Sequence, residues 1–270
     1  MRPVGTTEAM NTPVPERDAP RRRADRRVDG SVRRESLAES RVLVVGAGAL
    51  GVPAAAYLAA GGIGTIGIMD PDAVELSNLP RQILHRTDDL GRPKVLSLRD
   101  RLRRIDSHVG VETIEGRLDE TNASPLIAAY DFVIDASDNF ATKFLINDVA
   151  VALGIPFSHG GVLGFLGQTL TVVPGCGACY RCLFSAPPPP GETATCRDAG
   201  ILGPVAGLIG AIQAAQALAA LSGEPGLLID RLLTYDALQS RWREVRIARN
   251  PRCAGCSLAS TPHRREGVLQ

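Results

Sequence analysis

Apolar and polar residues alternate along this chain in blocks that predict strands and helices in turn. Short, unbroken apolar runs are typical of strands buried on both faces, and they occur at 41–45, 65–69 and 132–135. Apolar residues spaced three and four apart predict helices at 32–39, 51–60, 95–105, 119–130 and 138–153. With a short strand expected at 111–114, strands and helices alternate as in an α/β fold.

After residue 156 the pattern changes to shorter strands, expected at 156–159, 168–173, 233–237 and 242–247. The segment from Val205 to Leu221 is nearly all apolar, and its length is borderline for a membrane span. It contains Gln213 and Gln216, and Pro204 stands at its start, where a helix tolerates proline. We interpret it as a helix buried in the core or at a subunit interface.

Composition narrows the class of protein. The 270 residues, 44% of them apolar, suffice for one large domain, expected at 31–257. Residues 1–30 are almost devoid of apolar residues and predict a disordered arm, and 258–270 predict a flexible tail. A net charge of +1 argues against a nucleic-acid-binding surface. No apolar segment follows the basic N-terminal residues, so we expect no signal peptide and a cytoplasmic protein.

A glycine-rich turn follows the first predicted strand and is the main nucleotide-binding signal. Gly46 permits the tight turn, Gly48 lets the backbone approach a phosphate, and Gly51 lets helix and strand pack closely. The N–H groups and dipole of the helix start favour an anion. Asp70 ends the next strand, where a carboxylate can accept hydrogen bonds from a ribose.

This unit alone predicts a nucleotide but not which one, and NAD enzymes commonly carry it. The chain adds two cations, Arg81 in the run 77–82 and Lys94 in the run 91–94. An oxidoreductase needs no cations there, whereas an enzyme that cleaves a triphosphate must hold negative charge while a phosphoanhydride breaks. These residues favour a triphosphate.

Asp138 follows the predicted strand 132–135, whose end should meet the glycine-rich turn in one crevice. A carboxylate beside phosphates is unfavourable unless a cation lies between them, so we interpret Asp138 as a magnesium ligand. The alternative is a helix cap formed together with Asn139. We interpret Asp135 as structural, and His159 as either an acid/base residue or a structural histidine at a strand end.

Two C-x-x-C pairs, Cys179 with Cys182 and Cys253 with Cys256, have the spacing of a tetrahedral zinc site. Such a site would clip the C-terminal end onto the middle of the chain. Redox chemistry and free thiols are the alternatives. Cys176 has no evident partner and is interpreted as incidental.

Together these motifs carry a resemblance to a known family. In order from about residue 37 to 257, they resemble the bacterial adenylyltransferases that activate ubiquitin-like sulfur carriers, the HesA/MoeB/ThiF family related to ubiquitin-activating enzymes. The resemblance implies a Rossmann-like sheet, parallel and then antiparallel, with helices on both faces and a structural zinc knuckle. It also implies a homodimer that uses ATP and Mg²⁺ to adenylylate the C-terminal glycine of a β-grasp carrier, for later thiocarboxylate formation.

The resemblance also implies roles for individual residues. Lys94 and Arg81 would stabilise phosphate charge, Asp70 would hold the ribose, and Asp138 the magnesium. The nucleotide would be positioned by the glycine-rich turn, including the backbone of Ala49, and by Ser77, Asn78, Gln82 and Asn139. Relatives usually have glycine where Ala49 stands, but the backbone N–H survives that change. No rhodanese domain follows the zinc knuckle, so a separate protein is expected to donate the sulfur.

Two further candidates lie in segments that predict neither helix nor strand. Arg22 falls where family members carry an arginine that reaches the neighbouring subunit's ATP, although its usual aromatic and glutamine neighbours are missing. Cys196 follows a proline run, in a context where relatives carry a candidate thioester or acyl-disulfide residue. A solvated arm and an ordinary loop cysteine are the plainer alternatives. For the whole chain, the competing functions are a zinc-stapled, non-catalytic scaffold for β-grasp proteins and an NAD-dependent oxidoreductase.

Overall fold

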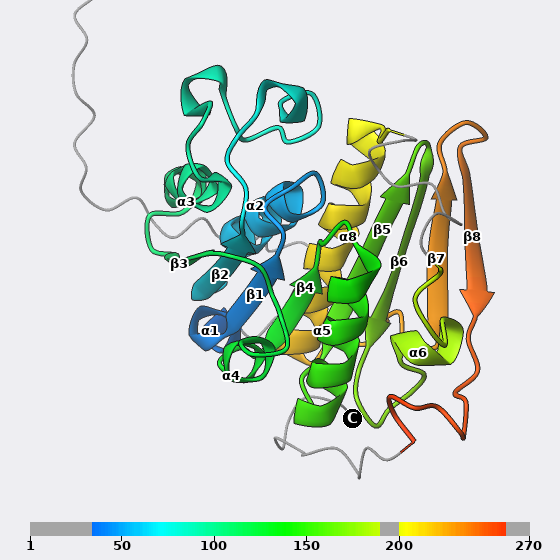
Figure 1. The fold of residues 1–270 in the computed structure, drawn as a ribbon. Helices are drawn as coiled ribbons and strands as arrows, with labels where there is room; N and C mark the ends of the chain where they lie inside the picture. Colours follow the sequence, from blue (N-terminus) through cyan, green and yellow to red (C-terminus); the bar gives the residue numbers. More distant parts are fainter. Residues whose placement is uncertain (1–33, 190–199, 258–270) are drawn as a thin grey trace, which may run out of the picture.

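The structure, a computed structural model, describes residues 34–189 and 200–257 (Figure 1). The described strands form one sheet in the order β3-β2-β1-β4-β5-β6-β7-β8. They are β1 Arg41–Val45, β2 Thr65–Asp70, β3 Gly110–Glu115, β4 Phe132–Asp135, β5 Phe157–Leu163, β6 Leu166–Val172, β7 Arg231–Asp236 and β8 Arg241–Arg246. The helices are α1 Arg34–Glu39, α2 Gly51–Gly61, α3 Lys94–Ile105, α4 Ala123–Ala128, α5 Phe140–Leu153, α6 Tyr180–Leu183 and α8 Gly203–Ser222, with short 3₁₀ turns η1 Leu76–Asn78 and η2 Thr87–Asp89.

The sheet changes direction at β5, as the resemblance implied. The neighbours from β3 to β5 pair in parallel, and β6, β7 and β8 continue the sheet in antiparallel pairs. The central strand β1 is buried on both faces because helices cover both sides. Val42 and Val44 pack in a core with α1, α2, α3 and α8, whereas Leu43 and Val45 pack in a second core with α4, α5 and α6. Figure 1 shows α5 and α8 on opposite sides of the sheet.

Helix α8 packs closely against both α2 and the sheet. A Cβ on Gly210 would lie 2.3 Å from the Leu50 carbonyl oxygen, and one on Gly167 of β6 would lie 2.7 Å from Ile209. The buried Gln213 donates from Nε2 to the backbone oxygens of Asp135 and Ser158, bridging β4 and β5. Helix α8 is long and apolar enough to cross a membrane by composition, but nearly half of its apolar window is buried inside the fold. The interpretation as a core helix fits this packing.

Several predicted boundaries were wrong. The helix expected at 119–130 is shortened to α4, Ala123–Ala128. Ahead of it, the side chains of Asp119 and Asn122 each accept the backbone N–H of the other residue and form a turn. Helix α5 starts at Phe140 rather than Asp138, since Asn139 caps it. Strand β5 runs on to Leu163 because it pairs with β6 along its whole length. The expected arm at 1–30 and tail at 258–270 lie outside the described residues.

Two glycines on α8, one turn apart, provide a matched test of this packing. We expect Gly210→Ala to destabilise the protein by about 1–3 kcal/mol, because its Cβ meets the backbone of Leu50. Gly207→Ala, which meets nothing within 4 Å, should leave stability unchanged or raise it by up to about 1 kcal/mol through helix propensity. Urea unfolding of both variants measures the difference, and equal stabilities would contradict the close approach of α8 to α2.

Candidate functional site

The carboxyl ends of β1, β2 and β4 bring most of the predicted nucleotide-binding residues to one edge of the sheet. β1 lies between β2 and β4, so the turns that follow these strands are neighbours. The glycine-rich turn follows β1, Asp70 ends β2, and Asp138 follows β4.

The glycine-rich turn is shaped by two close backbone contacts. Gly46 has φ 107°, and a Cβ there would lie 2.6 Å from the Ala136 carbonyl oxygen. A Cβ on Gly51 would lie 1.7 Å from the Gly46 carbonyl oxygen. At Gly48 the nearest atom would be Gln82 Nε2, at 3.8 Å. Packing therefore requires glycine at 46 and 51, whereas Gly48 leaves space in front of the backbone. No side-chain cap of α2 is present in the described residues, so its first N–H groups suit an anion.

Asp70 ties this turn to Lys94. Its Oδ2 accepts the Ala47 N–H at 2.7 Å, and its Oδ1 accepts the Asp72 N–H at 2.8 Å. The buried ammonium of Lys94 donates to Asp72 Oδ2 at 2.9 Å and lies 3.9 Å from Asp70 Oδ1. Burial raises the pKa of Asp70, while Lys94 and the two N–H donors oppose that rise.

The segment around η1 carries four predicted residues. Arg81 Nη1 donates to the Ser77 carbonyl oxygen at 2.8 Å, and the buried Asn78 donates to Ser77 Oγ at 3.3 Å. Gln82 is buried, and its Oε1 has no hydrogen-bond partner among residues 34–189 and 200–257. A Cβ on Gly203 would lie 3.3 Å from Arg81 Cα, so the start of α8 abuts this segment.

Asp135, at the end of β4, is almost completely buried and fully engaged. Its carboxylate accepts hydrogen bonds from Ser137 Oγ at 2.6 Å, Lys143 Nζ at 3.2 Å and His159 Nδ1 at 2.9 Å. Lys143 also donates to the Gly160 carbonyl oxygen at 2.8 Å, which joins α5 to β5. Burial alone would raise the pKa of Asp135, but Lys143 and the hydrogen bonds outweigh it and lower the pKa to about 2.

His159 has a partner that the sequence did not reveal. It lies inside β5 rather than at a strand end, directly opposite Asp135 in the parallel register. Burial, reinforced by Lys143, lowers the pKa of His159, so the neutral ring donates from Nδ1 to the carboxylate. Its Nε2 has no hydrogen-bond partner in the described part of the chain, and its ring lies 4.6 Å from that of Tyr180.

Asp138 is exposed in the turn between β4 and α5. The N-cap of α5 is Asn139, whose Oδ1 accepts the Thr142 N–H at 2.9 Å. The helix-cap role therefore belongs to Asn139, and the Asp138 carboxylate stays at the surface beside the turn that Gly46 contacts.

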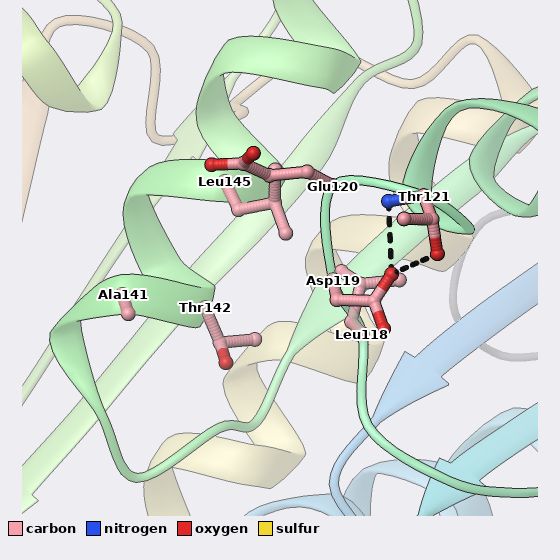
Figure 2. Close-up of a pocket in the computed structure, with 7 residues that line it drawn as sticks. All are labelled: Leu118, Asp119, Glu120, Thr121, Ala141, Thr142 and Leu145. Atoms are coloured by element: carbon pink, nitrogen blue, oxygen red, sulfur yellow. Dashed lines mark hydrogen bonds between the residues drawn. The ribbon is translucent and has the colours of Figure 1, made fainter.

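An open cleft of about 550 Å³ lies next to this turn. One wall is the loop from Leu118 to Thr121, and the other is the first part of α5, with Ala141, Thr142 and Leu145 (Figure 2). Its size suits a small molecule. The residues predicted to bind the nucleotide are not among those that line it.

The four paired cysteines come together although they lie far apart in the chain. Their sulfur atoms all lie within 4.8 Å of one another, with Cys179–Cys253 and Cys182–Cys256 at 3.5 Å and Cys179–Cys182 at 4.0 Å. A tetrahedral zinc–thiolate site requires sulfurs about 3.8 Å apart. These thiols therefore fit a single tetrahedral metal ion, and the exposed Cys176 is not part of the cluster.

The cysteine cluster packs on α5. The Tyr180 N–H, next to Cys179, donates to Asn147 Oδ1 at 2.9 Å. Arg181 donates to Asp148 at 2.7 Å and lies over the Phe144 ring, 4.8 Å from its centroid. The helix that begins beside Asp138 is thus braced by the cluster.

Two predicted residues, Arg22 and Cys196, lie outside the described residues. Conversely, sequence reasoning missed Asp72, His85 and Lys143, which contact predicted residues. For Asp72, the only signal in the sequence was its position two residues after Asp70. His85 and Lys143 meet their partners only through the tertiary fold.

Comparison with known proteins shows the family of this chain. A profile of the ThiF family matches residues 21–255. The chain belongs to the ThiF family. Among similar proteins, it is 44% identical over 239 residues to the sulfur carrier protein adenylyltransferase of Thermus thermophilus, covering 87% of this chain and 88% of that protein. It is 46% identical over 220 residues to the SAMP-activating enzyme E1 of Haloferax volcanii, covering 82% and 81%.

A longer relative is also similar in sequence, and a solved structure shares the fold. The ThiF-family chain is 45% identical to the adenylyltransferase and sulfurtransferase MOCS3 of Anopheles gambiae over 83% of its length, but spans only 51% of that protein. The crystal structure of E. coli MccB with MccA-N7isoASN superposes with a TM-score of 0.74 at 23% identity, covering 83% of this chain and 68% of that one. At this identity, the match supports the fold alone.

We expect the purified ThiF-family chain to contain about one zinc ion per molecule, bound by the cysteine cluster. Cys253→Ser should lose the metal and lower the thermal stability, because it removes a ligand that braces α5. Cys176→Ser, outside the cluster, is the control and should retain both. Elemental analysis and thermal unfolding measure these effects, and full metal content in Cys253→Ser would contradict the assignment.

The buried carboxylate of Asp135 should make the free energy of unfolding depend on pH. Because the pKa of Asp135 is lowered to about 2, its contribution is complete above its ordinary pKa near 4 and falls as pH drops from about 4 to 2. The difference in unfolding free energy between the wild type and Asp135→Asn should therefore be about 2 kcal/mol larger at pH 6 than at about pH 2. Urea unfolding from pH 6 downwards measures this difference. Asp138→Asn, an exposed neighbour, controls for the loss of one charge, and a pH-independent difference for Asp135→Asn would disprove the effect.

Proposed function

We propose that this ThiF-family chain is an adenylyltransferase that uses ATP to activate the C-terminal glycine of a ubiquitin-like, β-grasp sulfur carrier protein. The observation that carries the proposal is the linkage of three features at one edge of the sheet. Asp70 accepts a hydrogen bond from the glycine-rich turn and forms an ion pair with Lys94. The names of two close relatives, a sulfur carrier protein adenylyltransferase and a SAMP-activating enzyme E1, support the same chemistry.

In the proposed reaction a carboxylate oxygen of the carrier's terminal glycine attacks the α-phosphorus of ATP. The bond from that phosphorus to the oxygen bridging to the β-phosphate breaks, and pyrophosphate leaves with the electron pair. The product is an acyl-adenylate on the carrier. Negative charge on the phosphates must be held throughout, and the cations Lys94 and Arg81 together with the N–H groups at the start of α2 are suited to hold it.

The contacts of Lys94 support this role. Its buried ammonium has three donors, of which one is directed at Asp72, so others remain for phosphate oxygens. Asp70 can still accept a ribose hydroxyl, because each carboxylate oxygen has two lone pairs and, within the described chain, accepts one backbone N–H. Ser77, Asn78, Gln82 and Asn139 would complete the nucleotide contacts.

Metal ions have two separate proposed roles. Asp138, exposed beside the glycine-rich turn, would hold Mg²⁺, which supplies charge neutralisation for the triphosphate when bound. Zinc in the cysteine cluster would be structural, because four thiolates leave no open coordination position. Arg22 and Cys196 remain proposed contributors, the first to a neighbouring subunit's nucleotide and the second to a covalent intermediate.

Partners and compartment follow from the same proposal. We expect a homodimer, a carrier ending in Gly-Gly, and a separate sulfur donor that converts the acyl-adenylate to a thiocarboxylate. The described cysteines form no disulfide bonds with one another, and we expect the protein in the reducing cytoplasm. A non-catalytic scaffold would bind the carrier without chemistry, and an NAD-dependent oxidoreductase would bind nicotinamide. Neither would return pyrophosphate to ATP, so a pyrophosphate-exchange assay separates the adenylyltransferase from both.

With a panel of carriers ending in Gly-Gly, labelled pyrophosphate should return to ATP in the presence of Mg²⁺. Lys94→Gln and Asp138→Asn should each lower the exchange rate by about a hundredfold or more, because charge near the phosphates is lost. Arg103→Ala, an exposed change on the same helix as Lys94, is the control and should exchange like the wild type. Absence of exchange with every carrier, while carrier binding persists, would favour the scaffold.

A further inference from the structure

We propose that His85 is a positioning residue for the nucleotide-binding turn, which it fixes by holding the Ala47 carbonyl group and linking it to the helix that carries Lys94. The inference deepens the proposed ATP site and rests on it for its functional meaning. His85 is not part of the glycine-rich unit and is not among the cations expected to contact phosphate.

The first step concerns Ala47, which is held on both sides. Its N–H donates to Asp70 Oδ2 at 2.7 Å, and its carbonyl oxygen lies 3.2 Å from His85 Nε2. The planar trans peptide between residues 47 and 48 points the Gly48 N–H opposite to the Ala47 carbonyl. A side chain that draws this carbonyl inward therefore directs the Gly48 N–H outward, in the direction from which an anion would bind.

The second step concerns the other ring nitrogen. His85 Nδ1 lies 2.8 Å from Ser97 Oγ, and Ser97 is completely buried on α3, one turn after Lys94. The backbone N–H of His85 donates to the Gln82 carbonyl oxygen at 3.0 Å. The imidazole thus joins the turn to the helix that carries Lys94, and the backbone of His85 ties both to the segment that carries Arg81.

The protonation state of the ring agrees with this role. A carbonyl oxygen only accepts, so Nε2 must carry the proton and Nδ1 accepts the Ser97 hydroxyl. Burial lowers the pKa of His85 and Lys94 adds to that effect, whereas the hydrogen bond to Ala47 and the charges of Asp89 and Asp70 oppose it. The neutral ring is therefore the form that holds the turn.

Two substitutions separate positioning from simple core packing. The amide nitrogen of glutamine can take the place of Nε2 and reach Ala47, whereas that of asparagine takes the place of Nδ1 and reaches only Ser97. Both remove the ring, so both should lower stability. Only His85→Asn should release the carbonyl of Ala47.

The first measurement uses the ligand-free protein and does not depend on the proposed function. In ¹⁵N-resolved spectra, His85→Asn should shift the Gly48 amide signal, while His85→Gln should stay close to wild type. The Ala47 amide, which its hydrogen bond to Asp70 protects, should exchange about tenfold faster in His85→Asn only. Equal behaviour of the two variants at Gly48 would overturn the positioning role.

The second measurement is nucleotide affinity, by calorimetry with a non-hydrolysable ATP analogue and by the KM for ATP in exchange. His85→Asn should weaken both about tenfold, with His85→Gln within about threefold of wild type, since one neutral hydrogen bond is lost. Wild-type affinity in His85→Asn, together with reduced stability, would mean that His85 only packs the core. If the wild type itself binds no ATP, the proposed function fails, while the amide measurement still decides the role of His85.

Discussion

The hydrogen bond from the Ala47 N–H to the Asp70 carboxylate is the contact on which the site depends. It fixes the turn after β1 against the end of β2, although the two segments are joined only by a helix and its flanking loops. The same carboxylate lies beside the Lys94 ammonium, so the position of one cation follows from the position of one acid. Because Asp70 is buried, water competes little for these contacts, and the loss of either partner would leave a polar group unsatisfied.

A second buried acid organises the neighbouring part of the sheet in a similar way. Asp135 ends β4 as Asp70 ends β2, but besides Ser137 in the turn that follows, its partners are the side chains of Lys143 and His159. One acid thus serves the glycine-rich turn, and the other holds α5, which begins beside Asp138 and carries the cysteine cluster along its side. The two halves of the sheet meet where Gly46 touches the backbone after β4.

The strands, the glycine positions and the four-cysteine set could be read from the sequence, because each depends on local spacing or on residue type. Unbroken apolar runs at 41–45 and 132–135 required a sheet covered on both faces, and the two cores confirm this. The partner of His159 could not be predicted, because it depends on the register of two strands that are distant in sequence. The same holds for His85 and Lys143. The extra length of β5 arises from pairing with β6, which apolar periodicity does not encode.

The arrangement of the cysteines has a consequence for the order of events during synthesis. One pair precedes α8 and the other follows β8, so the four sulfurs enclose the whole of α8, β7 and β8 in one ring. A metal ion can acquire its full set of ligands only after residue 256 has left the ribosome. Strands β1 to β6 all precede the first cysteine pair and can already pair by then, so metal binding would close the ring only at the end of synthesis.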